Sequence, residues 1–159
     1  MRPSSSPDPR QRSGFTLLEL VMVLAILGIL ATIAAPKYAA AINRYRLDTA
    51  ARRVAADIDH ARALAKATGS AQTIRFATST SSYSILNYRV GTSKNAVYSV
   101  RLDLPPYSSS IESVDFDGSA DLIFAGAGAP TAGGFVRVRA GSETRSVVVD
   151  GVSGAIAVQ

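Results

Sequence analysis

One carboxylate stands alone in the most apolar stretch of the chain. Residues 15–35, FTLLELVMVLAILGILATIAA, carry a single charged side chain, that of Glu19. A run of about 20 apolar residues is long enough to cross a bilayer as a helix. A carboxylate inside such a helix costs roughly 2.5–3.5 kcal/mol on membrane-insertion scales, so it is functional by default and needs a partner. We therefore predict a membrane-spanning helix in which Glu19 pairs with a cation.

Few other residues have the chemistry for catalysis or metal binding. The chain has no cysteine and one histidine, His60, which excludes disulfides, thiolate metal sites and two-histidine metal sites. His60 follows Asp59 on the polar side of a predicted helix, so we expect it to be solvated. The glycine-rich segment GAGAPTAGG lacks the Lys-Ser/Thr ending of a phosphate-binding loop. We expect no enzyme activity, no cofactor and no metal.

A long helix positions Glu19. The apolar run is apolar all round, whereas core helices of small domains are amphipathic, which makes a buried core helix the less favoured alternative. No turn cluster follows the run, and Pro36 in a helix interior bends the rod rather than ending it. We therefore predict one helix from Phe15 to about Ala67, with hinges at Gly28 and Pro36. In its second half, residues 39–67, apolar side chains recur at steps of three and four on one face: Leu47, Ala51, Val54, Ile58, Ala61 and Ala65.

From Gln72 onward the apolar period becomes two, which is typical of strands. Short strands at close spacing indicate antiparallel sheets rather than βαβ units. The predicted fold class is α+β: a long N-terminal helix, half transmembrane and half amphipathic, packed on antiparallel sheets, with its apolar face on one sheet. The predicted strands are Thr73–Ala77, Tyr83–Tyr88, Val97–Leu102, Ile111–Phe116, Leu122–Ala125, Phe135–Arg139, Ser146–Asp150 and Ala155–Val158.

The net charge of +5 is unevenly distributed along the chain. Residues 1–14 carry three basic and one acidic side chain, a net charge of +2. Residues 37–66 carry seven basic and three acidic side chains, a net charge of +4. Residues 67–159 carry seven of each and are neutral, so this part has no electrostatic footprint for nucleic acid.

The junction SGFTLLEL carries the most specific motif. A polar, basic segment ends at Gly14, Phe15 opens the apolar run, and Glu19 follows four residues later. Here the chain resembles the type IV pilin and type II secretion pseudopilin superfamily, which implies a pilin-like fold. The resemblance implies that a prepilin peptidase cuts the Gly14–Phe15 bond and methylates the Phe15 amine with its own S-adenosylmethionine. In a staggered bundle, Glu19 of one subunit can then pair with the Phe15 amine of its neighbour, near the positive end of the helix dipole.

The C-terminal half, ADLIFAGAGAPTAGGFVRVRAGSETRSVVVDGVSGAIAV, resembles the GspH/FimT family of minor pseudopilins. In one departure, Ala155 follows Gly154 where the family often has a basic residue, which weakens any transfer of the nucleic-acid role of some relatives. The elements that carry the resemblance are Phe124–Gly126, Gly133–Gly134, Val136–Val138, Arg145–Val149 and Gly154–Val158, with an Ala-Arg pair at Ala61 and Arg62 in the helix.

Together the resemblances imply a minor pseudopilin of a type II secretion system, a structural subunit at or near the pseudopilus tip. The alternative is a FimT-like minor type IV pilin in pilus biogenesis or DNA uptake. Residues 1–14 would be a cleaved leader, 15–36 a transmembrane and assembly helix, and 37–159 a periplasmic domain anchored by one pass in the bacterial inner membrane. The implied partners are the major pseudopilin, other minor pseudopilins, the prepilin peptidase and the inner-membrane assembly platform.

Other interpretations stay open. Small residues at Ala34, Ala35 and 39–41 suit a signal peptide of a secreted β protein, but the run exceeds the usual 7–15-residue h-region and contains Glu19. A DNA-uptake pilin would need a basic surface outside the stem, and nothing positive supports a glycan-binding or hydrolytic β domain. A positive-inside count also opposes our topology: three bases precede the span and five follow it, at Lys37, Arg44, Arg46, Arg52 and Arg53. The periplasmic placement therefore rests on the resemblance alone.

Overall fold

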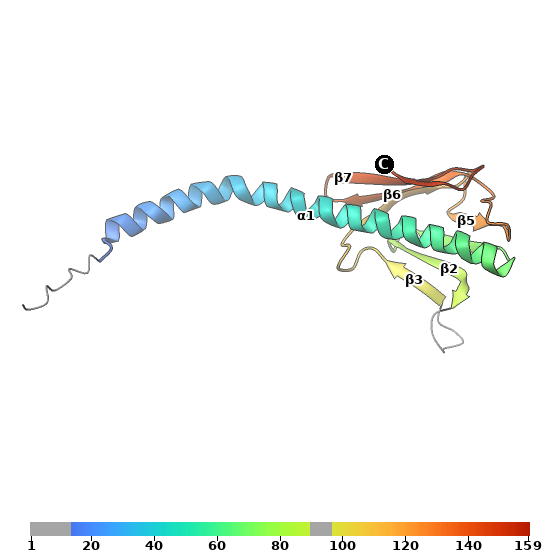
Figure 1. The fold of residues 1–159 in the computed structure, drawn as a ribbon. Coiled ribbons are helices and arrows are strands. Elements are labelled where there is room, and N and C mark those ends of the chain that lie inside the picture. Colours follow the sequence, from blue (N-terminus) through green and yellow to red (C-terminus); the bar gives the residue numbers. More distant parts are fainter. Residues whose placement is uncertain (1–13, 90–96) are drawn as a thin grey trace, which may run out of the picture. The chain divides into compact units, whose positions relative to one another are not determined.

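The computed structural model describes residues 14–89 and 97–159, and consists of one long helix followed by eight strands (Figure 1). The predicted leader, apart from Gly14, lies outside these residues. The order and type of every predicted element are confirmed, although β7 begins three residues earlier than predicted. The elements are α1 (Leu17–Thr68), β1 (Gln72–Ala77), β2 (Ser82–Arg89), β3 (Val97–Arg101), β4 (Ser110–Asp115), β5 (Asp121–Phe124), β6 (Gly134–Ala140), β7 (Glu143–Val149) and β8 (Ile156–Val158).

The strands form two antiparallel sheets of four. Sheet A has the order β3-β2-β1-β5 and sheet B the order β4-β6-β7-β8. Because β4 joins sheet B while β5 returns to sheet A, the chain passes between the sheets three times after β3. The β6–β7 hairpin pairs from Gly134↔Val149 to Ala140↔Glu143 without a register shift. Alternation along β6 points Val136 and Val138 into the core and leaves Arg137 and Arg139 exposed.

The second half of α1 and both sheets share one apolar core. The expectation that the helix would pack on a single sheet is wrong, because its buried face is wider than the predicted stripe and also includes Ala50 and Asp57. The largest fully buried side chains are Tyr83, Phe116, Phe124, Ile58, Ile74, Ile85, Leu102, Leu122, Val54, Val136, Val138 and Val147.

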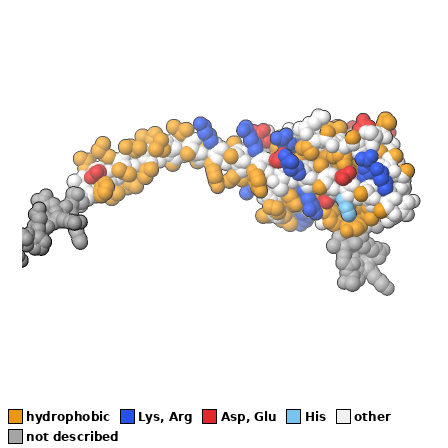
Figure 2. Space-filling view, viewed as in Figure 1, with side chains coloured by type: hydrophobic (Ala, Val, Ile, Leu, Met, Phe, Trp, Pro, Cys, Tyr) orange, Lys and Arg blue, Asp and Glu red, His pale blue; other side chains and the backbone are white. Residues whose placement is uncertain are grey.

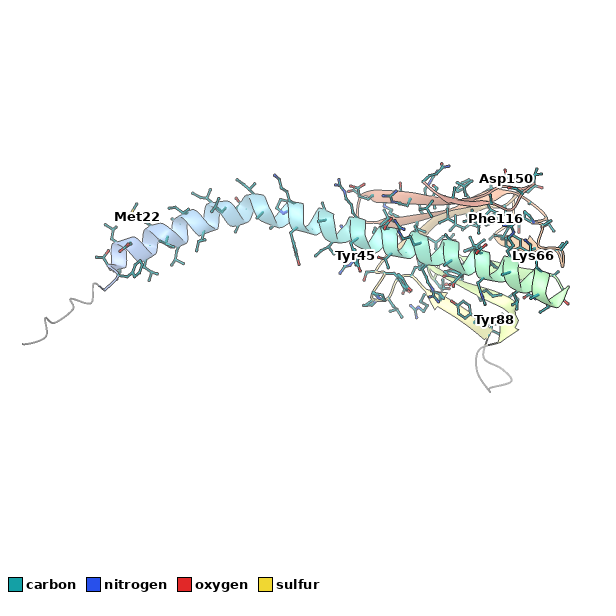
Figure 3. The ribbon with its side chains drawn as sticks, viewed as in Figure 1. Met22, Tyr45, Lys66, Tyr88, Phe116 and Asp150 are labelled. Atoms are coloured by element: carbon teal, nitrogen blue, oxygen red, sulfur yellow. The ribbon has the colours of Figure 1, made fainter. Side chains whose placement is uncertain are left out.

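The chain divides into two compact units between Tyr38 and Ala39. In the first unit the described residues form the start of α1, and its large apolar side chains, such as Met22, are exposed (Figures 2 and 3). By length and composition, α1 contains one stretch that is able to cross a membrane, and none of that stretch is buried within the protein. The second unit, Ala39–Gln159, contains the whole apolar core. We call the first unit the stem and the second the domain.

Candidate processing and assembly site

The Gly14–Phe15 bond lies just before the helix. Gly14, Phe15 and Thr16 precede the first residue of α1, Leu17. The Phe15 side chain is 78% exposed, and no neighbouring atom lies within 4 Å of the position that a Cβ on Gly14 would take. Exposed backbone outside secondary structure is the kind that proteases cut. The predicted scissile bond is therefore sterically open in this structure.

Thr16 caps the first turn of α1. Its Oγ1 accepts a hydrogen bond from the Glu19 N–H at 3.2 Å, and its carbonyl oxygen accepts one from the Leu20 N–H at 3.1 Å. Thr16 is thus the N-cap and Glu19 the third helical residue, which is the spacing of a capping box. Sequence reasoning missed this role, although the T-x-x-E pattern is the signal that reveals it.

Glu19 lies in the first turn of α1, where the helix dipole places partial positive charge. Its carboxylate makes no hydrogen bond or ion pair with any residue in the described ranges. The neighbouring side chains of Leu18 and Leu20 are apolar and exposed. Glu19 therefore places a negative charge without a partner among the described residues on an otherwise apolar surface.

The two predicted hinge residues lie further along the helix. Both Gly28 and Pro36 are inside α1, which continues through them, and the position of a Cβ on Gly28 is open. Pro36 has no N–H, so it cannot donate to the carbonyl of Thr32 one turn earlier. Gly14, Phe15 and Glu19 therefore come together at the start of the helix, whereas the two hinge positions are separate features. The hinging itself stays a prediction.

In the domain, a polar network ties α1 to sheet A. The Asp57 carboxylate is only 7% exposed and accepts hydrogen bonds from the Tyr83 hydroxyl at 2.5 Å and the Tyr98 hydroxyl at 2.8 Å. Both tyrosines donate to Asp57 Oδ2, and Arg53 Nε donates to that oxygen too, at 3.1 Å. Arg53 Nη2 also contacts the Tyr98 hydroxyl. Arg53 and Asp57 thus form an ion pair one helical turn apart, and its acidic member belongs to the buried face of α1. The tyrosine hydroxyls satisfy the carboxylate, which makes its burial tolerable.

This network shifts the acidity of the tyrosines. Burial, followed by the hydrogen bond to Asp57 and its negative charge, raises the pKa of Tyr83. The same causes in the same order raise the pKa of Tyr98, while Arg53 opposes them. Both hydroxyls are therefore held protonated as donors to Asp57. The network holds α1 against sheet A through these hydrogen bonds.

A second contact fixes two loops to the far part of α1. Arg62 Nε donates to the Gly128 carbonyl at 3.2 Å, and Arg62 Nη2 donates to the Ser153 carbonyl at 2.7 Å. The Ser153 turn is itself held by Asp150 Oδ1, which accepts the Val152 and Ser153 N–H groups. Gly154 adopts a positive φ of 65° beside this guanidinium. Arg62 and Gly154, which carry part of the sequence resemblance, thus belong to one set of contacts that holds both loops against α1.

The single histidine of the chain, His60, lies in the domain. His60 lies edge-on against Tyr88 with 5.0 Å between ring centroids (Figure 3 labels Tyr88). No group of three or more His, Cys, Asp or Glu side chains in residues 14–89 and 97–159 is arranged to hold a metal ion. The arrangement therefore supports assembly chemistry at the helix start and structural contacts in the domain.

The comparisons with known proteins agree with this geometry. Residues 9–35 match the prokaryotic N-terminal methylation motif, and residues 50–154 match the family of type II transport protein GspH. The second match covers more than half of the chain. A search of curated protein sequences gave no significant match.

Solved structures show the same fold. The type IV minor pilin FimU of Pseudomonas aeruginosa in space group P21 aligns with a TM-score of 0.55 and 15% identity, covering 73% of this chain and 90% of FimU. FimU in space group P65 aligns with a TM-score of 0.52 and 15% identity, covering 71% of this chain and 92% of FimU. The apolar stretch of α1 is a single-pass anchor of the kind typical of prepilin-like proteins. The chain belongs to the GspH family and is a minor pseudopilin or minor pilin with a prepilin N-terminus.

Proposed function

We propose that this chain is a structural minor pseudopilin of a type II secretion system, positioned at or near the tip of the pseudopilus. The observation that carries the proposal is the GspH match over residues 50–154, behind a prepilin methylation motif. The chain acts by assembly with other subunits and not by catalysis. The open Gly14–Phe15 bond and the unpaired Glu19 carboxylate support this role.

Processing prepares the subunit for assembly. A prepilin peptidase removes residues 1–14 and methylates the Phe15 amine, which then lies one residue before the N-cap, Thr16. The amine of one subunit pairs with Glu19 of the next, so that two charges enter the apolar bundle as a neutral pair. The exposed apolar side chains of the stem supply the surface that neighbouring stems cover.

The partners follow from this arrangement. The stem crosses the inner membrane once, and the domain lies in the periplasm. The stem packs with the major pseudopilin and the other minor pseudopilins, while the inner-membrane assembly platform inserts the subunit. Pilin-type packing of stems around a common axis leaves the sheets at the periphery of the filament.

A minor type IV pilin in pilus biogenesis is the second candidate. FimU, which has the same fold, is a type IV minor pilin, and this motivates the second candidate. At 15% identity the likeness itself concerns the fold alone. A role in DNA uptake has less support, because residues 67–159 are neutral and Ala155 stands where relatives often carry a base.

Deletion of the gene separates the two candidates. We expect the deletion to abolish secretion of a type II substrate and to leave surface pili and twitching intact. Lost pili with normal secretion would favour the pilin alternative. Intact-mass analysis of the membrane-bound protein should give an N-terminus at methylated Phe15, whereas one near Ala35 or Ala41 would support a secreted protein with a signal peptide.

A further inference from the structure

We propose that the end of the domain that follows the stem docks on anionic phospholipid headgroups through arginines of α1 and of the β6–β7 hairpin. The inference goes beyond the proposed function and rests on one part of it, the membrane anchoring of the stem. The chemistry of the partner is a phosphate-bearing lipid surface with net negative charge.

Two segments build this end of the domain. The β6–β7 turn approaches α1 so closely that a Cβ on Gly141 would lie 2.5 Å from the Asn43 side-chain nitrogen. Beside it, Arg44 Nε donates to Glu143 Oε1 at 3.1 Å. A hollow of about 300 Å³ lies between helix and hairpin, and both Arg44 and Arg145 line it. The hairpin therefore places its charges beside those of the helix.

The charges at this end are unbalanced. We call Arg44, Arg46, Arg139 and Arg145 the basic end. Glu143 pairs with Arg44, and Glu112 pairs with Arg139 at 3.4 Å. Neither Arg46 nor Arg145 has an acidic partner in residues 14–89 and 97–159. Four bases against two acids leave an excess of +2, and the two bases in excess are Arg46 of α1 and Arg145 of the hairpin.

The short connection to the apolar run limits how far this excess charge can lie from the bilayer. Arg44 follows Ala35, the last residue of the apolar run, by nine positions, so at about 1.5 Å per residue a helical connection between them is roughly 14 Å long. The headgroup layer occupies about 5–7 Å of that height. The remaining distance between Arg44 and the headgroup layer is then at most about one Debye length at physiological salt.

Side-chain types on α1 fit a headgroup surface. Figure 2 shows Lys and Arg side chains grouped along the part of the helix that follows the apolar stretch. Tyr45, between Arg44 and Arg46, is 72% exposed and projects from the helix in Figure 3. Tyrosine is enriched at membrane interfaces, and basic clusters next to a span attract anionic lipid. Continuity with the span and charge complementarity together point to lipid.

The proposal also explains the charge count that opposed our topology. Bases that follow a span work against translocation of the segment that carries them. Docking on headgroups gives these bases a role after translocation, since it holds the domain at the membrane surface until assembly lifts the subunit away.

The experiment uses the full, processed chain in vesicles. Because the chain has no cysteine, a single Ser142→Cys substitution at the exposed hairpin turn accepts one fluorophore. Nitroxide-labelled headgroups then report how close the turn lies to the lipid. We expect strong quenching in vesicles that contain phosphatidylglycerol, weak quenching in phosphatidylcholine alone, and relief of quenching at high salt.

Charge variants test the residues. Each of Arg46→Gln and Arg145→Gln should lower the docking equilibrium about fivefold, and the double variant about 25-fold. The matched control is Lys66→Gln, which removes one charge near the other end of α1 (Figure 3) and should leave docking unchanged.

Three results would overturn the proposal. These are equal quenching in both lipids, variants that quench like the wild type, and docking that appears only at high protein density, which would assign the surface to a neighbouring subunit. A chain that fails to float with vesicles of either composition would instead overturn the membrane anchoring itself.

Discussion

In the assembly that we propose, Glu19 is the residue whose chemistry matters most. Its carboxylate has no partner within the described part of the chain, and Thr16 uses only its backbone N–H. Replacing it with leucine keeps an apolar helix, so we expect normal membrane insertion and leader cleavage. We expect the Glu19→Leu variant to be absent from sheared filaments, because the Phe15 amine of a neighbour would be left as an unpaired charge.

The matched variants separate charge from shape. Glu19→Gln keeps the side-chain length without the charge and should fail like leucine, whereas Glu19→Asp, shorter by one methylene, should restore incorporation in part. The readout is the amount of each variant that co-purifies with filaments. Normal incorporation of the leucine variant would remove the pairing argument.

The Tyr83 hydroxyl should contribute measurably to the stability of the domain. Removal of its hydroxyl leaves the buried Asp57 carboxylate with one donor fewer. Hydrogen bonds to charged groups contribute about 1.5–3 kcal/mol, so we expect Tyr83→Phe to lower the free energy of unfolding by that amount. Tyr98→Phe should cost less, since Tyr98 is only partly buried. Urea unfolding of the domain measures both, and equal losses would contradict the ranking.

The raised pKa values of Tyr83 and Tyr98 predict a pH dependence. An unfolded tyrosine ionises near pH 10, while the folded residue keeps its proton at higher pH. The stabilisation is therefore complete below about pH 10 and is lost as pH rises above it, by up to about 1.4 kcal/mol per pH unit for the buried Tyr83 and by less for the partly exposed Tyr98. Unfolding curves at successive alkaline pH values should show this slope, reduced in Tyr83→Phe; an unchanged slope would refute the assignment.

At the scale of elements, glycines allow the loops to close on the sheets. A Cβ on Gly134, at the start of β6, would lie 2.0 Å from the Asp115 carbonyl oxygen of β4. Gly118 has a positive φ of 79° but open space around it. We expect Gly134→Ala to force the strands apart and cost about 3 kcal/mol, against about 1 kcal/mol of strain for Gly118→Ala. Thermal unfolding of both variants tests this, and a milder Gly134→Ala would show that the strands yield easily.

Local pattern predicted the elements but not their assembly. Steps of three and four residues in α1 and of two in strands such as β6 follow from how each element meets a core, so the sequence alone reveals them. Which sheet a strand joins depends on long-range pairing. Nothing in the local sequence shows that β4 pairs within sheet B while β5 pairs within sheet A. Asp57 was missed for the same reason: its donors, Tyr83 and Tyr98, come from strands distant in sequence. The Thr16 cap was within reach, because its T-x-x-E signal is local.

At the scale of the whole chain, two kinds of apolar surface have different uses. In the domain, the apolar face of α1 is covered by both sheets within the same chain. In the stem, large apolar side chains such as Leu24 and Ile29 stay exposed and have no cover among the described residues. Under the proposed function, lipid covers this surface before assembly and other stems cover it afterwards. One helix thus serves both folding and assembly.

This division predicts that the domain can be separated from the stem. A fragment that starts at Ile42 retains every residue of the apolar core, from Leu47 to Val149, and lacks the exposed stem. We expect it to be soluble and monomeric, and to unfold in one cooperative transition that neither chelators nor reductants change. Sedimentation and calorimetry measure these properties. Aggregation of the fragment would mean that residues before Ile42 are needed to complete the fold, whereas unfolding by a chelator would reveal a structural metal.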